Sequence, residues 1–236
     1  MEKISHFIDG KIYSVSSSRT GPVFNPAIGQ QIAEVELANK DTVKLAVNSA
    51  SKAYLKWSKT TPISRSRILE KYKVLIVKNM DELAELVSKQ HGKTIPDSKG
   101  SIQRGIEVVE YATGITSALK GEHSTSVGTN VDSHTLRQPL GVCAGITPFN
   151  FPAMVPMWMF PLAIVCGNTF ILKPSEKDPS CSIRLAELFT EAGLPNGVFN
   201  VLNGDKKSVD NILNNNDIAS VSFVGSTPVA KYIYEE

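Results

Sequence analysis

Cysteine and histidine are scarce in this sequence of 236 residues, and their scarcity argues against two kinds of site. The three cysteines, Cys143, Cys166 and Cys181, are odd in number and lie in or beside apolar segments. This is typical of reduced thiols rather than of a disulfide framework. The cysteines are 23 and 15 residues apart, which matches no metal site, and the four histidines are scattered. We therefore expect no bound metal.

A large net charge and a long hydrophobic run are also missing. The formal charge is +2, from 25 basic and 23 acidic residues, which favours neither a nucleic-acid partner nor an anionic membrane surface. The longest apolar stretch, 151–166, contains three prolines and is too short to span a membrane. Residues 1–10 have no apolar core of a secretory signal. The sequence predicts a cytoplasmic protein, or one of the mitochondrial matrix if the chain is eukaryotic and its transit peptide has been trimmed.

Residues 1–121 carry the signals of a hairpin and several helices. An Asp-Gly pair predicts a β-hairpin over 7–13, and residues 23–35 predict a turn followed by a short strand. Three helices are predicted next: the first is capped by Asp41, the second runs from about Ser64 to the stop at His91-Gly92, and the third covers 101–119. This part of the chain is therefore predicted to be mainly helical.

Residues 122–140 differ in composition from both neighbouring parts. They are polar and rich in serine and threonine, with Gly128-Thr129-Asn130 in the middle, which indicates an exposed β-hairpin arm. An arm of this composition cannot cover its own face. We expect it to pair with another part of the molecule or with a partner subunit.

From Gly141 to the last residue, apolar strands of about five residues alternate with helices. This alternation predicts a parallel, doubly wound α/β sheet of the Rossmann-like kind. Such sheets bind ligands beyond the carboxyl ends of their strands. Three motifs follow strands in this way, namely ITPFNFP (146–152), LKPSEK (172–177) and FVGSTP (223–228). Their convergence predicts a ligand site at this edge.

Two of these motifs offer groups that suit a nucleotide, although each also has a simpler interpretation. Glu176 could accept both hydroxyls of an adenosine ribose and disfavour a 2′-phosphate, with Lys173 donating to the same sugar. The pair could equally be a solvated charged loop, and no G-x-G-x-x-G is present. Gly225-Ser226 could bind a phosphate at a helix amino terminus, or Ser226 or Thr227 could simply cap that helix.

Asn150 and Arg104 are the candidates for contacts with a substrate. Asn150 could cap a helix that begins at Pro152, or it could be a rigid donor to an oxyanion. Arg104 could be solvated, as most helical arginines are, or it could hold a carboxylate through its two-pronged guanidinium. Cys143 and Cys166 are interpreted as small core residues and not as nucleophiles.

Five long stretches together resemble the NAD(P)-dependent aldehyde dehydrogenases, in that family's order and spacing. They cover essentially the whole chain and read VFNPAIGQQIAEV, QPLGVCAGITPFNFP, GNTFILKPSEKDP, EAGLPNGVFNVLNG and VSFVGSTPVAK. Phe149 in place of a common tryptophan, the PMWMFPLAIVCGN segment and HGKTIPDSKG…QRGIEVVEYA are most similar to the methylmalonate-semialdehyde dehydrogenases. That group converts malonate or methylmalonate semialdehyde into an acyl-CoA with NAD and coenzyme A, with loss of CO2 overall.

The resemblance implies a role for each candidate residue. Asn150 matches the oxyanion-hole amide, and Arg104 matches an arginine expected to hold the substrate carboxylate. The remaining matches concern the cofactor: Thr147 and Phe149 line its site, and Gly225 with Ser226 lies at the pyrophosphate. Lys173 and Glu176 bind the adenosine ribose and favour NAD over NADP. Lys177 replaces the usual arginine, so this position keeps its positive charge but loses the two-pronged guanidinium. The implied domains are an amino-terminal helical part of the cofactor domain (1–121), an oligomerisation arm (122–140) and a truncated NAD-binding α/β part (141–236).

The family's chain is roughly twice as long, so the resemblance also implies an incomplete fold without the catalytic domain and its nucleophilic cysteine. We expect an amino-terminal fragment that is inactive and poorly stable alone, from an enzyme that is a dimer or tetramer at full length. Two alternatives stay open. One is a non-catalytic NAD-binding protein, and the other is a hydrolytic enzyme of the succinate-semialdehyde type that uses no coenzyme A.

Overall fold

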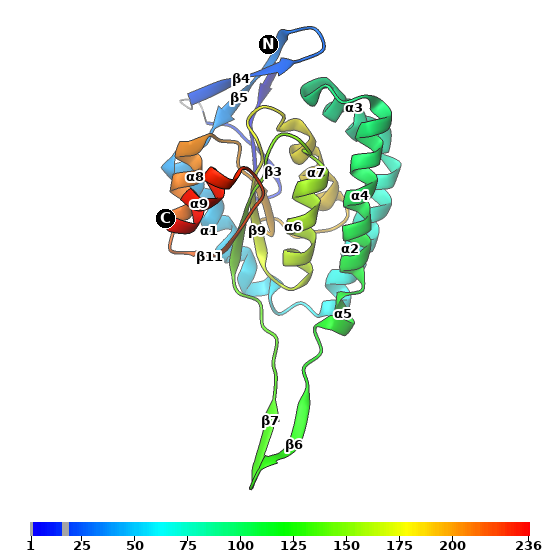
Figure 1. Cartoon of the computed structure of the whole chain (residues 1–236), viewed down its shortest axis with the longest axis vertical. Helices are drawn as coiled ribbons and strands as arrows, with labels where there is room; N and C mark the ends of the chain where they lie inside the picture. Colours follow the sequence, from blue (N-terminus) through cyan, green and yellow to red (C-terminus); the bar gives the residue numbers. More distant parts are fainter. Residues whose placement is uncertain (1, 16–18) are drawn as a thin grey trace.

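The computed structural model describes residues 2–15 and 19–236, and its largest sheet has six strands in the order β11-β8-β9-β10-β2-β3 (Figure 1). The strands are β2 (His6–Ile8), β3 (Lys11–Tyr13), β8 (Val142–Ile146), β9 (Thr169–Lys173), β10 (Phe199–Val201) and β11 (Ile218–Phe223). β11, β8, β9 and β10 are parallel, whereas β2 and β3 add antiparallel strands at one edge. The predicted parallel sheet is confirmed.

The hairpin predicted over 7–13 is also confirmed, and it completes the large sheet. Asp9 and Gly10 both have positive φ, 56° and 76°, which is the geometry of a tight two-residue turn. A short-range sequence signal therefore gives the hairpin itself. Its pairing with β10, through Phe7 and Val201, joins segments that are far apart in the sequence and has no local signal.

Helices cover both faces of the large sheet. One face carries α1 (Lys40–Trp57) and α8 (Lys206–Leu213), with α9 (Thr227–Glu235) beside α8. The other face carries α6 (Met154–Val165) and α7 (Ser180–Glu191). An outer layer of α2 (Pro62–Lys78), α3 (Met80–His91) and α4 (Ile95–Thr113) covers these two helices. Successive residues of β9 point to opposite faces, so Phe170 and Leu172 join one core and Ile171 the other. Both strand faces are buried, as in other parallel sheets.

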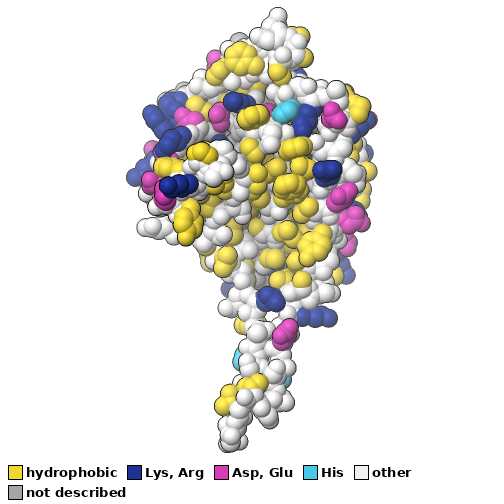
Figure 2. All heavy atoms as spheres, in the orientation of Figure 1, with side chains coloured by type: hydrophobic (Ala, Val, Ile, Leu, Met, Phe, Trp, Pro, Cys, Tyr) yellow, Lys and Arg dark blue, Asp and Glu magenta, His cyan; other side chains and the backbone are white. Residues whose placement is uncertain are grey.

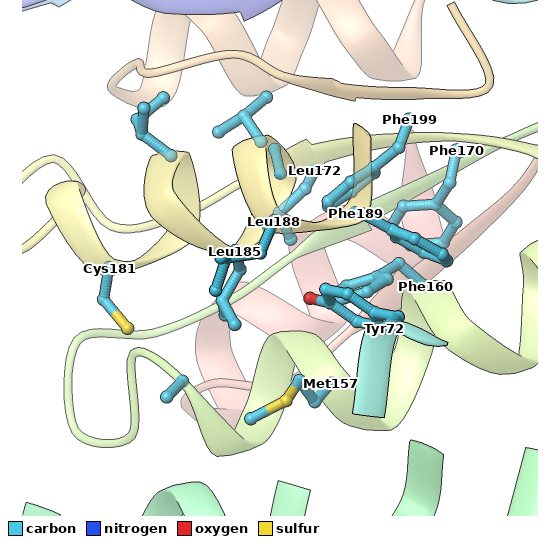
Figure 3. Close-up of a cluster of buried hydrophobic side chains, with 14 of the residues drawn as sticks. Tyr72, Met157, Phe160, Phe170, Leu172, Cys181, Leu185, Leu188, Phe189 and Phe199 are labelled. Atoms are coloured by element: carbon cyan, nitrogen blue, oxygen red, sulfur yellow. The ribbon is translucent and has the colours of Figure 1, made fainter. Parts of the chain in front are cut away.

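Aromatic side chains fill the core between the sheet and the outer helices (Figure 3). The Tyr72 ring of α2 stacks on Phe189 of α7, with centroids 4.1 Å apart. Phe160 of α6 stacks on Phe199 of β10 at 4.4 Å. These contacts tie α2 to α7 and α6 to the sheet, so the amino-terminal helices belong to the same core as the parallel strands.

A second sheet of three strands, β1-β5-β4, is not predicted by the sequence as a sheet. β5 (Gln30–Leu37) pairs with β1 (Glu2–Ile4) in parallel and with β4 (Arg19–Asn25) in antiparallel. The turn and the following strand expected within 23–35 are present, because Gly29 has a φ of 65° and β5 starts next to it. The expectation omitted the partners of that strand.

Three helix boundaries differ from the predicted ones. Asn39, not Asp41, caps α1, because its side-chain oxygen accepts from the Thr42 N–H at 2.9 Å. The helix expected from Ser64 to His91 is two helices, since Asn79 leaves the helical conformation and donates its side-chain amide to the Leu75 carbonyl at 2.7 Å. The third helix begins at Ile95, capped by Thr94, and a separate turn of helix, α5 (Ile115–Ala118), follows its end.

The predicted arm is confirmed as an exposed hairpin. β6 (His123–Gly128) pairs with β7 (Val131–His134), and every residue of both strands is exposed. The hairpin projects from the body of the molecule on two extended segments (Figure 1). Its pairing with a partner subunit stays a prediction.

Hydrophobic side chains also gather on an exposed face over α6 and its neighbours (Figure 2). Trp158 of α6 is 42% exposed and Tyr111 of α4 is 68% exposed. α9 contributes no buried residue, and its Tyr234 is 92% exposed. An apolar face of this kind is a feature of interaction surfaces and of aggregation-prone chains. The poor stability that we expect of the isolated chain is consistent with this exposed apolar face but stays a prediction.

Candidate functional site

The three motifs that follow strands start at the same level of the sheet. In the strand register, Ile146 is opposite Lys173 on one side and Phe223 on the other. Two hydrogen bonds continue this register into the turns, from Thr147 N to Lys173 O (3.1 Å) and from Val224 N to Ile146 O (3.2 Å). The three turns therefore lie side by side at one edge, which is where doubly wound sheets bind ligands.

Lys173 and Glu176 lie at and just after the end of β9, beside the central turn that follows β8. The Lys173 ammonium is buried, donates to the Gly204 carbonyl at 2.8 Å and lies 3.7 Å from the Glu176 carboxylate. Burial lowers the pKa of Lys173, and the nearby Glu176 opposes that shift. The Glu176 side chain keeps 40% of its surface exposed. An ammonium has three donors, so Lys173 can bond a ligand beside Glu176 without losing Gly204.

Thr147 belongs to the turn after β8, and Gly225 and Ser226 belong to the turn after β11. The Thr147 hydroxyl is buried, and the described part of the chain offers it no hydrogen-bond partner. A Cβ on Gly225 would lie 2.3 Å from the Phe223 ring, so no larger residue fits there unless that ring moves. Ser226 occupies the N-cap position of α9 in an extended conformation, yet within the described residues its side chain makes no capping hydrogen bond. Ser226 therefore has the N-cap position that the simpler interpretation gives it, with a proline in the first turn, but its hydroxyl makes no capping bond within the described residues.

Phe149 is half exposed, and its ring contacts one cationic neighbour, Lys177, and one aromatic neighbour, His91. Lys177 Nζ lies 4.6 Å from its ring centroid, and the His91 ring stacks on it at 6.4 Å. These residues line a cavity of about 510 Å³ together with Glu176 and Asp178. Phe149 is thus the residue of the 146–152 loop that lines this cavity.

Asn150 does not cap the helix that follows it. α6 begins at Met154, its N-cap position is Ala153, and Pro152 lies outside the helix. Asn150 is exposed, whereas Pro152 and Ala153 are buried. The cap interpretation is wrong because three residues separate the amide from the first helical residue, out of reach of the first-turn N–H groups.

Arg104 lies on the exposed side of α4 and lines a second cavity, of about 310 Å³. Lys93, Asp97 and Phe151 line the same cavity. Lys93 Nζ lies 3.7 Å from the Phe151 ring centroid, and burial lowers the pKa of this lysine while Asp97 opposes the shift. Arg104 and Glu176 thus line different cavities, and residues 149–151 contribute a phenylalanine to each.

The cysteines are unsuited to nucleophilic attack. Cys143 and Cys181 are buried and Cys166 is half-buried. Burial raises the pKa of all three thiols, that of Cys143 to about 11. The interpretation of Cys143 as a core residue is confirmed. In residues 2–15 and 19–236, no cluster of three or more His, Cys, Asp or Glu side chains is arranged to hold a metal, and no helix is both long and apolar enough to cross a membrane.

Several residues that line the two cavities are not predicted from the sequence as site residues. His91, Lys93, Phe151 and Asp178 line one cavity or the other. The glycine stop at His91-Gly92 is predicted correctly, since Gly92 ends α3 with a φ of 89°. The HGK signal marks the end of a helix, but nothing in it indicates that His91 and Lys93 contact Phe149 and Phe151.

The topology and the three aligned turns define an α/β protein of the doubly wound class, in which ligands bind at the carboxyl ends of the parallel strands. The family model described as the aldehyde dehydrogenase family matches residues 13–236. The chain belongs to the aldehyde dehydrogenase family, and the resemblance in the sequence is confirmed.

Several relatives are similar over the entire chain. It is 50% identical over 236 residues to a malonate-semialdehyde dehydrogenase of Pseudomonas aeruginosa, covering 100% of this chain and 47% of the relative. A Sinorhizobium meliloti protein described as a methylmalonate-semialdehyde dehydrogenase, solved with NAD, is 54% identical with a TM-score of 0.97, over 100% of this chain and 48% of that one. The methylmalonate-semialdehyde dehydrogenase DddC of Oceanimonas doudoroffii is 51% identical to this chain with a TM-score of 0.97, over 100% of this chain and 48% of that one. The chain thus spans about half the length of these relatives.

Proposed function

We propose that this chain provides the NAD-binding part and the oxyanion donor of a dehydrogenase that oxidises malonate or methylmalonate semialdehyde to an acyl-CoA. The observation that carries the proposal is the strand register, which brings the turns after β8, β9 and β11 to one edge. The names of the similar proteins support the semialdehyde, and the NAD complex of the Sinorhizobium meliloti protein supports the cofactor.

The residues at the edge fit NAD. The Glu176 carboxylate would accept the two ribose hydroxyls, with Lys173 donating beside it, and its charge would repel the 2′-phosphate of NADP. The partnerless Thr147 hydroxyl, the ring of Phe149 and the charge of Lys177 line the same side. Gly225 and Ser226 would present N–H groups and a hydroxyl to the pyrophosphate at the start of α9. When bound, NAD supplies the acceptor for a hydride.

Two further residues would act on the substrate. The exposed Asn150 amide would donate to the oxygen of the aldehyde as negative charge develops on it. Arg104 would bind the carboxylate of the semialdehyde from the cavity that Phe151 also lines. Coenzyme A would accept the acyl group, and the arm of 122–140 would pair with another copy in an oligomer.

The isolated chain should not turn over. Covalent aldehyde oxidation needs a thiolate, and burial holds the pKa of each of the three thiols above its ordinary value. The relatives are about twice as long, and our proposal assigns the nucleophile to the part of them that this chain does not span. Incubation with malonate semialdehyde, NAD and coenzyme A should give no NADH above the blank. Turnover would overturn this part of the proposal.

Binding of NAD can be measured without turnover, by thermal unfolding. A ligand at one hundred times its Kd stabilises a protein by about 2.7 kcal/mol, which raises the Tm of a chain of this size by roughly 5–10 °C. We expect such a rise with NAD and a smaller one with NADP. Glu176→Ala should abolish the rise with NAD, whereas Glu70→Ala, an exposed carboxylate on α2, should retain it. If NAD gives no rise at all, the cofactor assignment is wrong.

Two other functions make different predictions. A non-catalytic NAD-binding protein would show the same thermal shift and would be stable and monomeric alone. A hydrolytic enzyme of the succinate-semialdehyde type would, at full length, release a free acid with coenzyme A omitted. The names of the similar proteins support malonate or methylmalonate semialdehyde over succinate semialdehyde, and the acyl-CoA product rests on the resemblance in the sequence.

A further inference from the structure

The cavity beside Arg104 contains a second cation. Lys93 and Arg104 line it together with one carboxylate, Asp97, so its charged side chains sum to +1. In the described part of the chain neither Lys93 nor Arg104 forms an ion pair, while the neighbouring Lys99 is engaged with Asp81. The cavity therefore suits a small monoanion.

The backbone on both sides of Lys93 is fixed. Gly92 ends α3 with its N–H bonded to the Ser88 carbonyl, and a Cβ on it would lie 2.8 Å from Pro26. On the other side Thr94 caps α4 through a bond from the Asp97 N–H at 3.3 Å. Lys93 is thus in a link of three residues between two capped helix ends. A cation on a fixed backbone loses less conformational freedom when it binds an anion.

The Phe151 ring fixes the side chain as well. Lys93 Nζ lies over this ring at 3.7 Å, within the range of a cation–π contact. Phe151 follows Asn150 directly, so the ammonium lies against the loop that carries the oxyanion donor. In malonate semialdehyde a single methylene separates the carboxylate from the aldehyde carbon. A substrate this short needs its cation close to the oxyanion donor.

We propose that Lys93, held by Phe151, is a second cation for the substrate carboxylate and selects short aldehydes that carry a carboxylate. The inference rests on the proposed function, and it adds to Arg104 a residue from the α3–α4 link. Arg104 binds through a planar fork, whereas Lys93 contributes a point charge beside the loop of Asn150. Uncharged aldehydes gain nothing from this pair.

The probe for this site is 3-hydroxypropionate, which has the carbon skeleton and carboxylate of malonate semialdehyde with a hydroxyl in place of the aldehyde. Its neutral counterpart is 1,3-propanediol. Both are titrated into the 236-residue chain at low salt without NAD, and the Kd is taken from NMR chemical-shift changes. Lys93→Met should raise the Kd of 3-hydroxypropionate about tenfold, equivalent to about 1.4 kcal/mol, and leave the diol unchanged. Lys93→Arg should stay within about threefold of the wild type.

Two controls separate this role from others. Lys89→Met removes a lysine from the last turn of α3, outside the cavity, and should leave the Kd of 3-hydroxypropionate unchanged. The rise in Tm with NAD should be the same in Lys93→Met as in the wild type. If the wild type binds 3-hydroxypropionate but NAD does not raise its Tm, the NAD assignment is wrong while the anion site is retained.

Three results would overturn the inference. The first is a wild type that does not bind 3-hydroxypropionate. The second is a Lys93→Met variant that binds it as the wild type does while Arg104→Met loses it, which leaves Arg104 as the sole cation. The third is an equal loss of anion and diol binding in Lys93→Met, which assigns to Lys93 only the packing of Phe151.

Discussion

Asp178 should make the protein less stable as the pH rises above neutrality. Its side chain lies between β9 and α7, is 2% exposed, and has no hydrogen-bond partner for either carboxylate oxygen among the described residues. Burial, reinforced by the charge of Glu176 and opposed by Lys177, raises its pKa from 3.8 to about 8. Asp178 is therefore protonated in the folded protein at pH 6.5 and ionised in the unfolded chain.

The sign follows from proton binding. Between pH 3.8 and about 8 the folded state holds a proton that the unfolded state has released, so the free energy of unfolding falls as pH rises through this window. His6 acts oppositely. It is buried, and burial lowers its pKa from 6.5 to about 4, so the unfolded state holds the extra proton between those values. His6 therefore opposes Asp178 between about pH 4 and 6.5, and His91, whose pKa burial also lowers, acts in the same direction as His6.

Between pH 6.5 and about 8, His6 no longer opposes the effect of Asp178. At 1.36 kcal/mol per pH unit, this window of roughly 1.5 units gives a loss of about 2 kcal/mol. The assay is urea unfolding, followed by tryptophan fluorescence, at half-unit steps from pH 4.5 to 9. Asp178→Asn keeps the shape of the side chain and should remove the decline above pH 6.5. Asp217→Asn, an exposed carboxylate, should retain it.

The reasoning is refuted if the free energy of unfolding is constant or rises from pH 6.5 to 8.5. It is also refuted if Asp178→Asn declines as steeply as the wild type. His6→Asn supplies an independent check, because removing this opposing histidine should make the free energy of unfolding fall more steeply with pH between about 4 and 6.5 than it does in the wild type.

Two substitutions test the packing and capping of the amino-terminal helices. Gly105→Ala would place a Cβ 2.1 Å from the buried Met157 of α6. We expect it to lower the free energy of unfolding in urea by about 1–2 kcal/mol, because the cost of overpacking exceeds the gain in helix propensity from alanine. Gly100→Ala, whose added Cβ would meet nothing within 4 Å, should instead stabilise α4 by about 0.5–1 kcal/mol. Equal effects would contradict the close approach of α4 and α6. Asn39→Ala should lower the free energy of unfolding by about 1 kcal/mol, and Asp41→Ala by less than half of that, because Asn39 provides the cap; the reverse order in urea unfolding would reinstate Asp41.

The elements that the sequence predicts well are those with a local signal. Buried runs such as those of β8 and β9 and the Asp9-Gly10 turn depend on neighbours within a few residues. The break at Asn79 is missed because hydrophobic residues keep a helical spacing on both sides of it, while the break depends on one side-chain bond to Leu75. The β1-β5-β4 sheet is missed because its strands pair between distant segments.

The candidate site divides in the same way. The turns at Thr147, Glu176 and Ser226 are predictable, because each follows a recognisable strand and parallel strands end at one edge. The contacts of His91 with Phe149 and of Lys93 with Phe151 are not, because stacking and cation–π contacts leave no pattern in either segment. The sequence thus predicts the edge of the sheet, and the fold adds the α3–α4 link beside it.

Asn150 shows why a locally plausible cap can be misassigned. A cap must directly precede its helix, and a helix beginning at Pro152 would place Phe151 in that position. The residue before a proline is also driven toward extended conformations, so the two prolines of TPFNFP keep Thr147 and Phe151 out of a helix. In the structure α6 starts only at Met154, and Asn150 stays exposed between two rings that His91, Lys177 and Lys93 contact. Contacts to its neighbours therefore restrain the amide, which leaves its own donors available to a ligand.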